Sequence, residues 1–249
     1  MTDTPAPRPA LILGAGSDIA RALALKLAAE GRPIVLAGRN APALERDAAD
    51  IAIRCRVSAE ARAWDAEDIS SAGAFLDALP VMPAIVVSAV GLLGDQQETQ
   101  GDPARIQKIV AVNFTGPAVM LEAAAERLAA LPEDTAVIGI GSVAGDRGRA
   151  RNYWYGAAKA ALETMLSGLR QRFFGTRLLV MTVKPGFVST AMTEGMDLPA
   201  ALTLSADEEA ELILKALKRR RTHAVHWKWR LLMAVIRNLP EAVFLRTKF

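Results

Sequence analysis

Short apolar runs alternate with amphipathic stretches along most of the chain. The runs typical of buried strands are ALILG (10–14), PIVLAGR (33–39), ARAWD (61–65), AIVVSAVG (84–91), TAVIGIGS (135–142) and RLLVMTVKPG (177–186). Stretches with helical spacing lie between or beside these runs, at 18–31, 42–54, 103–130 and 153–174. This alternation predicts parallel strands joined by right-handed crossovers, which is a Rossmann-type doubly wound α/β sheet.

The chain has no internal repeat and no linker long enough to divide it, so we expect a single domain. Residues 10–226 are expected to form its Rossmann-type part. The polar, Pro-rich start, 1–9, is expected to be a disordered lead-in and has no features of a secretory signal. The basic, amphipathic stretch 227–249 is expected to be a C-terminal segment of the same domain.

The cysteine content and the charge distribution indicate the compartment and the kinds of partner to expect. The single cysteine, Cys55, cannot form an internal disulfide, which favours a reducing, cytoplasmic compartment. The net charge is +3, but residues 215–249 hold ten Lys or Arg and one acid, so they carry +9 and residues 1–214 carry −6. A basic end on an acidic body indicates an anionic surface or partner, although a solvated basic helix end explains the same charge. No nucleic-acid partner is expected, and His223 and His226 have no cysteine or acid cluster beside them to form a metal site.

A glycine-containing turn follows the first predicted strand. Gly14 ends that strand, Gly16 lies in the turn, and Ser17, Asp18 and Ile19 open the next helix. A glycine turn lets the backbone approach a pyrophosphate, and a helix N-terminus supplies N–H donors and positive potential. The sequence therefore predicts a dinucleotide site at this turn.

The end of the second predicted strand bears on which dinucleotide binds. Sites for NAD usually carry an acid there, which binds the ribose hydroxyls. This chain has Gly38 and Arg39 instead. Because a guanidinium suits the 2′-phosphate of NADP, we predict NADP(H) as the cofactor. The alternative is a solvent-exposed arginine with no cofactor role.

The stretch NYWYGAAKAAL offers two tyrosines and one lysine. Tyr155 and Lys159 are four residues apart, so they share a helix face. A nearby ammonium group favours phenolate and lowers a tyrosine pKa toward the working range of a proton shuttle. Ser142 stands at the tip of a predicted strand, where open α/β sheets bind ligands, and its hydroxyl could orient a substrate carbonyl.

Together these motifs resemble the short-chain dehydrogenase/reductase family over nearly the whole chain. In that family the serine lies thirteen residues before the tyrosine, as Ser142 does before Tyr155. Tyr153 lacks both spacings and is interpreted as a packing or pocket residue. The resemblance implies a catalytic set of Ser142, Tyr155, Lys159 and Asn113, in which Asn113 of AVNFTG holds a water in the proton relay to the lysine.

The resemblance also implies further cofactor contacts. Asp65 in AWDAED matches the acid that contacts adenine, and VKPGFVST matches the Pro-Gly motif beside the nicotinamide. The contacts implied by VKPGFVST are those of Pro185, Gly186, Val188 and Thr190, and Tyr155 and Lys159 are expected to touch the cofactor too. Two departures stand out. Of the family's Gly-x-x-x-Gly-x-Gly turn only Gly14 remains, with Asp18 and Ala20 in the other places, and SAVG (with Ala89 and Gly91) replaces Asn-Ala-Gly.

A narrower resemblance involves AVGLLGDQQE, AGDRGRARNYWYGAAKA and KWRLLMAVIRNLPEAVF. These segments are similar to the decaprenylphosphoryl-2-keto-ribose reductases, which act with a flavin oxidase. That implies hydride transfer to a keto-sugar on a polyprenyl phosphate. Two alternatives are a short-chain dehydrogenase for an unrelated small alcohol or ketone and a non-catalytic NADP-binding protein. The complete catalytic set argues against the second.

The C-terminal segment alternates basic residues with Trp, Leu, Val, Ile and Phe. Such a segment can lie on an anionic membrane with its apolar face down. It can equally pack as a helix over the substrate pocket or against a partner in a homo-oligomer, which we also expect. The two roles are compatible.

Overall fold

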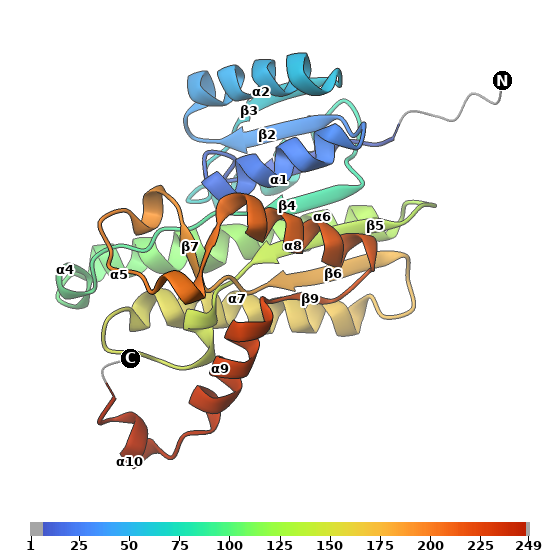
Figure 1. Cartoon of the computed structure of the whole chain (residues 1–249). Helices are drawn as coiled ribbons and strands as arrows, with labels where there is room; N and C mark the ends of the chain where they lie inside the picture. The colour runs from blue at the N-terminus through green and yellow to red at the C-terminus, as the bar shows by residue number, and fades with distance from the viewer. Residues whose placement is uncertain (1–6, 248–249) are drawn as a thin grey trace.

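The computed structural model describes residues 7–247 and contains a seven-stranded parallel sheet of order β3-β2-β1-β4-β5-β6-β9 (Figure 1). The strands are β1 (Ala10–Leu13), β2 (Ile34–Gly38), β3 (Ala59–Ala63), β4 (Ile85–Ser88), β5 (Thr135–Ile140), β6 (Leu178–Val183) and β9 (His223–Ala224). The order reverses between β1 and β4, the position at which open α/β sheets bind ligands. The predicted doubly wound fold is confirmed.

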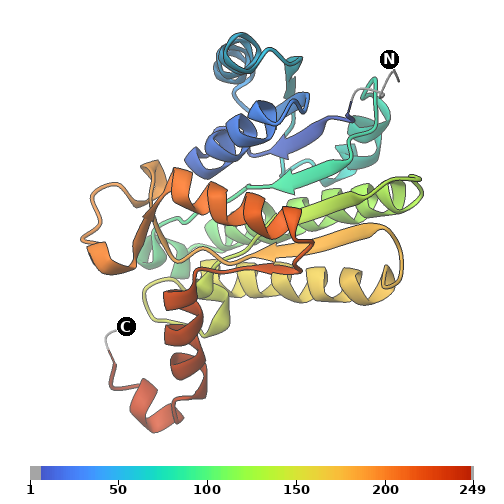
Figure 2. The same cartoon turned by 45° about the vertical axis from the view of Figure 1, so that its right-hand side comes forward.

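Helices cover both faces of the sheet (Figures 1 and 2). The longer ones are α1 (Asp18–Ala29), α2 (Ala41–Cys55), α5 (Pro103–Val110), α6 (Gly116–Ala129), α7 (Tyr153–Arg172), α8 (Ala206–Lys218) and α9 (Trp227–Asn238). The short ones are α3 (Ala72–Asp77), α4 (Gln96–Gln100) and α10 (Glu241–Phe244). A second, two-stranded sheet pairs β7 (Phe187–Ser189) with β8 (Thr203–Ser205). Each face of the main sheet contributes to its own apolar core, as expected for parallel strands.

The six strands expected from apolar runs all form, but the third lies at 59–63 rather than 61–65. The long helix expected at 103–130 is instead divided. A π-helical turn, η2 (Ala111–Thr115), separates α5 from α6. At its end, a Cβ at Gly116 would overlap the carbonyl of Ala66, so only glycine lets the backbone come so close.

Part of the stretch 1–9, expected to be disordered, is held in place. Residues 1–6 of the expected lead-in lie outside the described part. The Arg8 guanidinium, however, donates to Glu133 and to the Met82 carbonyl, and the Pro9 carbonyl accepts the N–H of Ala84. Residues 8 and 9 are therefore fixed by backbone and side-chain contacts before β1 starts.

The C-terminal segment leaves the β9 edge of the sheet as α9 and ends in α10 (Figures 1 and 2). One side of α9 is buried through Trp229, Met233 and Ile236, which pack with Val143. Within residues 7–247, no helix combines the length and apolar character needed to cross a bilayer.

Candidate active site

A cavity of about 770 Å³ opens at the carboxyl ends of the central strands. Its lining contains Ser142 and all of the residues predicted to contact the cofactor. The latter are Gly14, Gly16, Ser17, Asp18, Ile19, Arg39, Asp65, Ala89, Gly91, Tyr155, Lys159, Pro185, Gly186, Val188 and Thr190. Residues far apart in the sequence thus meet where the strand order reverses.

Ser142 and Tyr155 form the polar centre of this cavity. Ser142 caps the 3₁₀ turn η3 (Val143–Asp146), and its Oγ accepts the N–H of Ala144 at 3.1 Å. Burial raises the pKa of Tyr155 to about 12, whereas its hydrogen bond with Ser142 lowers that pKa. The phenol therefore keeps its proton at neutral pH, as a proton donor must.

Lys159 lies one turn further along α7 and is 2% exposed. Its Nζ donates to the carbonyls of Val90 at 3.1 Å and Ile140 at 3.0 Å. Burial lowers the pKa of Lys159 to about 8. Lys159 Nζ is 5.7 Å from the centre of the Tyr155 ring.

From the spacing in the sequence, Lys159 is expected to lower the pKa of Tyr155. In the structure burial dominates, and the groups that oppose it are the Ser142 hydroxyl and the Arg149 guanidinium. The ammonium group of Lys159 is directed at backbone carbonyls instead. Through these two hydrogen bonds, Lys159 joins the loop after β4 to the end of β5. Its contacts therefore stabilise the shape of the site.

Asn113 lies behind the cavity rather than in its lining. It is fully buried in η2, where its Oδ1 accepts the N–H of Leu92 at 3.0 Å. Its Nδ2 donates to the carbonyls of Leu92 at 2.8 Å and Ile109 at 2.9 Å. Asn113 therefore fixes the loop after β4. Its role in holding a water stays a prediction.

The glycine turn packs closely against the loop after β4. Gly14 has φ +70°, and a Cβ there would lie 2.8 Å from the backbone nitrogen of Val90, so no other residue fits. The carboxylate of Asp18 turns toward the 3₁₀ turn η4 (Ala191–Thr193), where it accepts the N–H of Ala191 at 2.8 Å. The acid that replaces a family glycine thus links the first helix to the loop after β7.

Arg39 lies at the far edge of the cavity with 64% of its side chain exposed. Its only ion-pair contact in the described part of the chain is a distant one, 3.8 Å from Glu67. Glu67 also approaches Lys108 at 3.6 Å. The Asp65 carboxylate accepts the N–H of Glu67 at 3.0 Å. The cationic side chains of Arg39 and Lys108 therefore both lie near the Glu67 carboxylate, at the edge of the cavity where the 2′-phosphate is expected.

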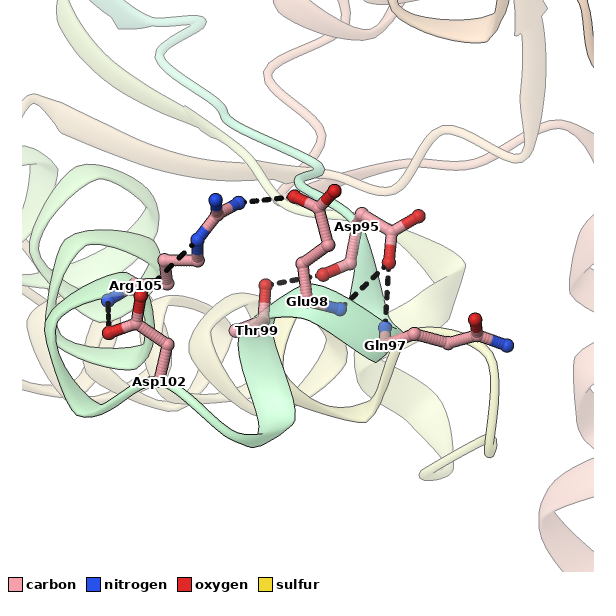
Figure 3. A network of polar contacts seen from close by, with 6 residues as sticks. All are labelled: Asp95, Gln97, Glu98, Thr99, Asp102 and Arg105. Carbon is pink, nitrogen blue, oxygen red and sulfur yellow. Dashed lines mark hydrogen bonds and ion pairs between the residues drawn. The ribbon is translucent and has the colours of Figure 1, made fainter.

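The loop after β4 builds one rim of the cavity. Asp95 caps α4 and Asp102 caps α5 through backbone N–H groups, and Arg105 contacts both Glu98 and Asp102 (Figure 3). These contacts fix the N-termini of α4 and α5 and join the two helices to each other.

The contacts between α4 and α7 separate the two tyrosines. Gln96 accepts the N–H of Trp154 at 3.2 Å, and the Tyr153 hydroxyl donates to Gln100 at 3.4 Å. Tyr153 therefore belongs to the outer rim, whereas Tyr155 faces Ser142.

Besides Lys108 and Glu67, the charged residues Arg149 and Glu163 belong to the site but were not singled out from the sequence. Arg149 lines the cavity, and its charge lowers the pKa of Tyr155. Glu163 lies behind Ser142, and its Oε1 accepts the Ser142 N–H at 3.1 Å. The spacing of Tyr155, Lys159 and Glu163, each four residues after the last, is the pattern that could have revealed Glu163.

Comparison with known proteins agrees with this geometry. The sequence profile of the family described as short chain dehydrogenase matches residues 8–199. The chain therefore belongs to the short-chain dehydrogenase family, which makes it an NAD(P)-dependent oxidoreductase.

Several proteins are similar over their full length. An uncharacterized oxidoreductase of Mycobacterium tuberculosis (strain H37Rv) is 34% identical over 252 residues, covering 99% of both chains. An uncharacterized oxidoreductase of Streptomyces coelicolor is 34% identical over 248 residues, covering 96% of both. A short-chain dehydrogenase from Sphingobium yanoikuyae in complex with NADPH shares the fold, with a TM-score of 0.78, 22% identity, and coverage of 94% of this chain and 97% of that one. A Burkholderia cenocepacia short chain dehydrogenase in complex with NADP has a TM-score of 0.79, 18% identity and 98% coverage of both.

Proposed function

We propose that this protein is an NADP(H)-dependent ketone reductase. The observation that carries the proposal is that Ser142, Tyr155 and Lys159 line one cavity together with the glycine turn. The nicotinamide, when bound, supplies a hydride to the carbonyl carbon. Ser142 holds the carbonyl oxygen, and Tyr155 gives it a proton as negative charge develops. One ketone becomes one alcohol, and the phenolate left on Tyr155 regains its proton from solvent.

The remaining residues hold the reactants. Lys159 would bind the nicotinamide ribose, and Asn113 supports the loop that carries Gly91. Arg39 favours NADP(H) over NAD(H), because a guanidinium can bind the 2′-phosphate directly. The NADPH and NADP complexes of proteins with the same fold support this choice.

For the substrate we propose a keto-sugar carried on a polyprenyl phosphate. The three segments behind that resemblance are joined in the fold, because the middle one contacts each of the other two. The loop after β4 contacts the start of α7 through Gln96 and Trp154. The loop before α7 holds the C-terminal segment through Arg147, which donates to the carbonyls of Ile236 and Leu239, both at 2.7 Å. A flavin oxidase that forms the keto-sugar would be the functional partner, and the protein would act as a homo-oligomer.

Peripheral membrane contact belongs to the same proposal. The outward face of α9 presents an exposed apolar stripe of Trp227, Leu231 and Val235, spaced four residues apart. Trp229 and Ile236 are among the apolar residues that alternate with basic ones in this segment. In the structure they do not face outward but are buried against the body of the protein. The segment can therefore pack against the Pro-Gly turn of the cavity through Trp229 on one side and meet an anionic surface on the other.

The direct test is a reduction assay with NADPH and a synthetic polyprenylphosphoryl 2-keto-ribose of short chain. We expect stoichiometric loss of NADPH and formation of one equivalent of the polyprenylphosphoryl sugar with a hydroxyl group at carbon 2. Turnover of simple ketones but not of this compound would support the family-level activity and reject the substrate. NADPH binding with no turnover of any ketone would favour a non-catalytic binding protein.

A further inference from the structure

A mostly buried ion-pair cluster lies directly behind Ser142, outside the cofactor cavity. Lys184 Nζ is 2.7 Å from a carboxylate oxygen of Glu163 and also pairs with Asp146. The three side chains are 9–15% exposed. They belong to different parts of the site, because Lys184 precedes the Pro-Gly turn, Glu163 is in α7 and Asp146 ends η3.

The second carboxylate oxygen of Glu163 faces the turn that carries Ser142. Glu163 Oε1 accepts the Ser142 N–H at 3.1 Å. A Cβ at Gly141 would lie 2.5 Å from the same oxygen, and one at Gly145 would lie 3.2 Å from it. The glycines of GIGSVAG therefore make room for this carboxylate on both sides of the serine.

The charge of Glu163 also acts along α7. It raises the pKa of Lys159 against the effect of burial, and it raises the pKa of Tyr155. Burial raises the pKa of Glu163 itself, while Lys184 lowers it. Other charged or titratable groups share its surroundings and line a cavity of about 610 Å³ between α7 and α9. They are Asp146, Arg170, Lys184, His223, Arg230 and Arg237.

We propose that Glu163, held by Lys184, is a positioning residue that sets the orientation of Ser142 from behind the active site. This role rests on the proposed reductase function. A purely structural ion pair would predict only a loss of stability when Glu163 is replaced. If Glu163 positions Ser142, its replacement should also change kcat. The change should depend on whether the new side chain still accepts the Ser142 N–H.

The test compares Glu163→Gln with Glu163→Ala, using NADPH and the short-chain polyprenylphosphoryl 2-keto-ribose. The glutamine keeps a carbonyl acceptor for Ser142 but removes the charge, so we expect kcat within about tenfold of wild type at the pH optimum. The alanine removes the acceptor, and we expect kcat to fall by up to ~10²-fold with the NADPH KM unchanged. Glu126→Gln, an exposed carboxylate on α6 that pairs with Arg172, is the matched control and should leave kcat unchanged.

A pH measurement separates this inference from the proposed function. Since Glu163 raises the pKa of Lys159, Glu163→Gln should move the titration of the Lys159 ammonium, followed by ¹⁵N NMR without substrate, to a pH below about 8. If wild type turns over neither the polyprenylphosphoryl 2-keto-ribose nor a simple ketone but this shift occurs, the reductase proposal fails and the coupling of Glu163 to the site stands. If wild type is active, while both variants lose equal kcat and equal stability and Lys159 titrates unchanged, the positioning role is overturned.

Discussion

Gly186 and Trp229 touch so closely that a Cβ added at Gly186 would overlap the indole ring. Trp229 is fully buried, and its Nε1 donates to the carbonyl of Leu202 at 2.8 Å. Its ring also meets Phe187 edge-on, with 5.0 Å between ring centres. The C-terminal helix therefore supports the Pro-Gly turn that is predicted to lie beside the nicotinamide.

Gly186→Ala should damage cofactor binding because the added methyl group must displace a tryptophan held in place by the core. Overpacking of this kind costs about 1–3 kcal/mol of stability. We expect a lower free energy of unfolding in denaturant and weaker NADPH binding by fluorescence titration. Gly168→Ala in α7, where an added Cβ meets nothing within 4 Å, is the control. Equal behaviour of the two variants would contradict the packing argument.

Arg39→Gln should remove the preference for NADP(H). A charge-assisted contact to the 2′-phosphate contributes ~1.5–3 kcal/mol, which corresponds to roughly 10–150-fold in affinity. Titration should show weaker NADPH binding in the variant and unchanged NADH binding. Arg54→Gln, which removes an exposed arginine from α2, should leave both affinities as they are. Tighter binding of NADH than of NADPH by the wild type would refute the assignment.

The outward stripe of α9 should bind anionic vesicles. Basic residues contribute about 1 kcal/mol each near an anionic surface and are screened by salt, whereas inserted apolar side chains are not. Co-sedimentation should therefore weaken but persist as salt rises, and neutral vesicles should bind poorly. Leu231→Ser should reduce the salt-resistant part, while Ile53→Ser, an exposed apolar residue on α2, should not. Absence of binding to anionic vesicles at low salt would remove the membrane contact and leave the reductase intact.

Glu209 should make stability depend on pH. Neither of its carboxyl oxygens has a hydrogen-bond partner in the described part of the chain, and burial raises its pKa from 4.5 to about 7. The folded state therefore binds the proton more tightly than the unfolded state. Stability should fall as pH rises from 4.5 to 7 and then level off, by about 3 kcal/mol in total.

The measurement for Glu209 is denaturant unfolding of wild type and Glu209→Gln across that pH range. The difference in unfolding free energy between the two should change with pH, since the amide does not titrate. Glu211→Gln, at an exposed position of the same helix, provides the control. A difference that is constant with pH would show that Glu209 does not titrate on folding.

The strands β1, β2, β4, β5 and β6 were predictable because they are continuous apolar runs, buried on both faces. The break between α5 and α6 was not, since it depends on the contact of Gly116 with Ala66, which lies in a distant part of the chain. The sequence also did not show which face of α9 is buried and which is exposed. Trp227, Leu231 and Val235 repeat as regularly as the buried residues, and only packing decides which face turns inward.

The catalytic residues were predictable where their roles follow from the number of residues between them in the sequence. The interval between Ser142 and Tyr155 selected the tyrosine that the structure places beside the serine. The electrostatics did not follow from spacing, because burial outweighs nearby charge in setting the pKa of Tyr155 and of Lys159. Glu163 continues the four-residue spacing of Tyr155 and Lys159, but its contact with the backbone N–H of Ser142 became evident only in the structure.

The most direct test of the account compares Tyr155→Phe with Tyr153→Phe in NADPH-dependent reduction of the short-chain polyprenylphosphoryl 2-keto-ribose. Tyr155→Phe should lower kcat by at least ~10²-fold, the scale of a general acid, while NADPH still binds. Tyr153→Phe should cost far less, because its hydroxyl contacts only the rim residue Gln100 among the described residues. Equal losses in the two variants, or a Tyr155→Phe protein that retains full turnover, would contradict the assignment of Tyr155 as the proton donor.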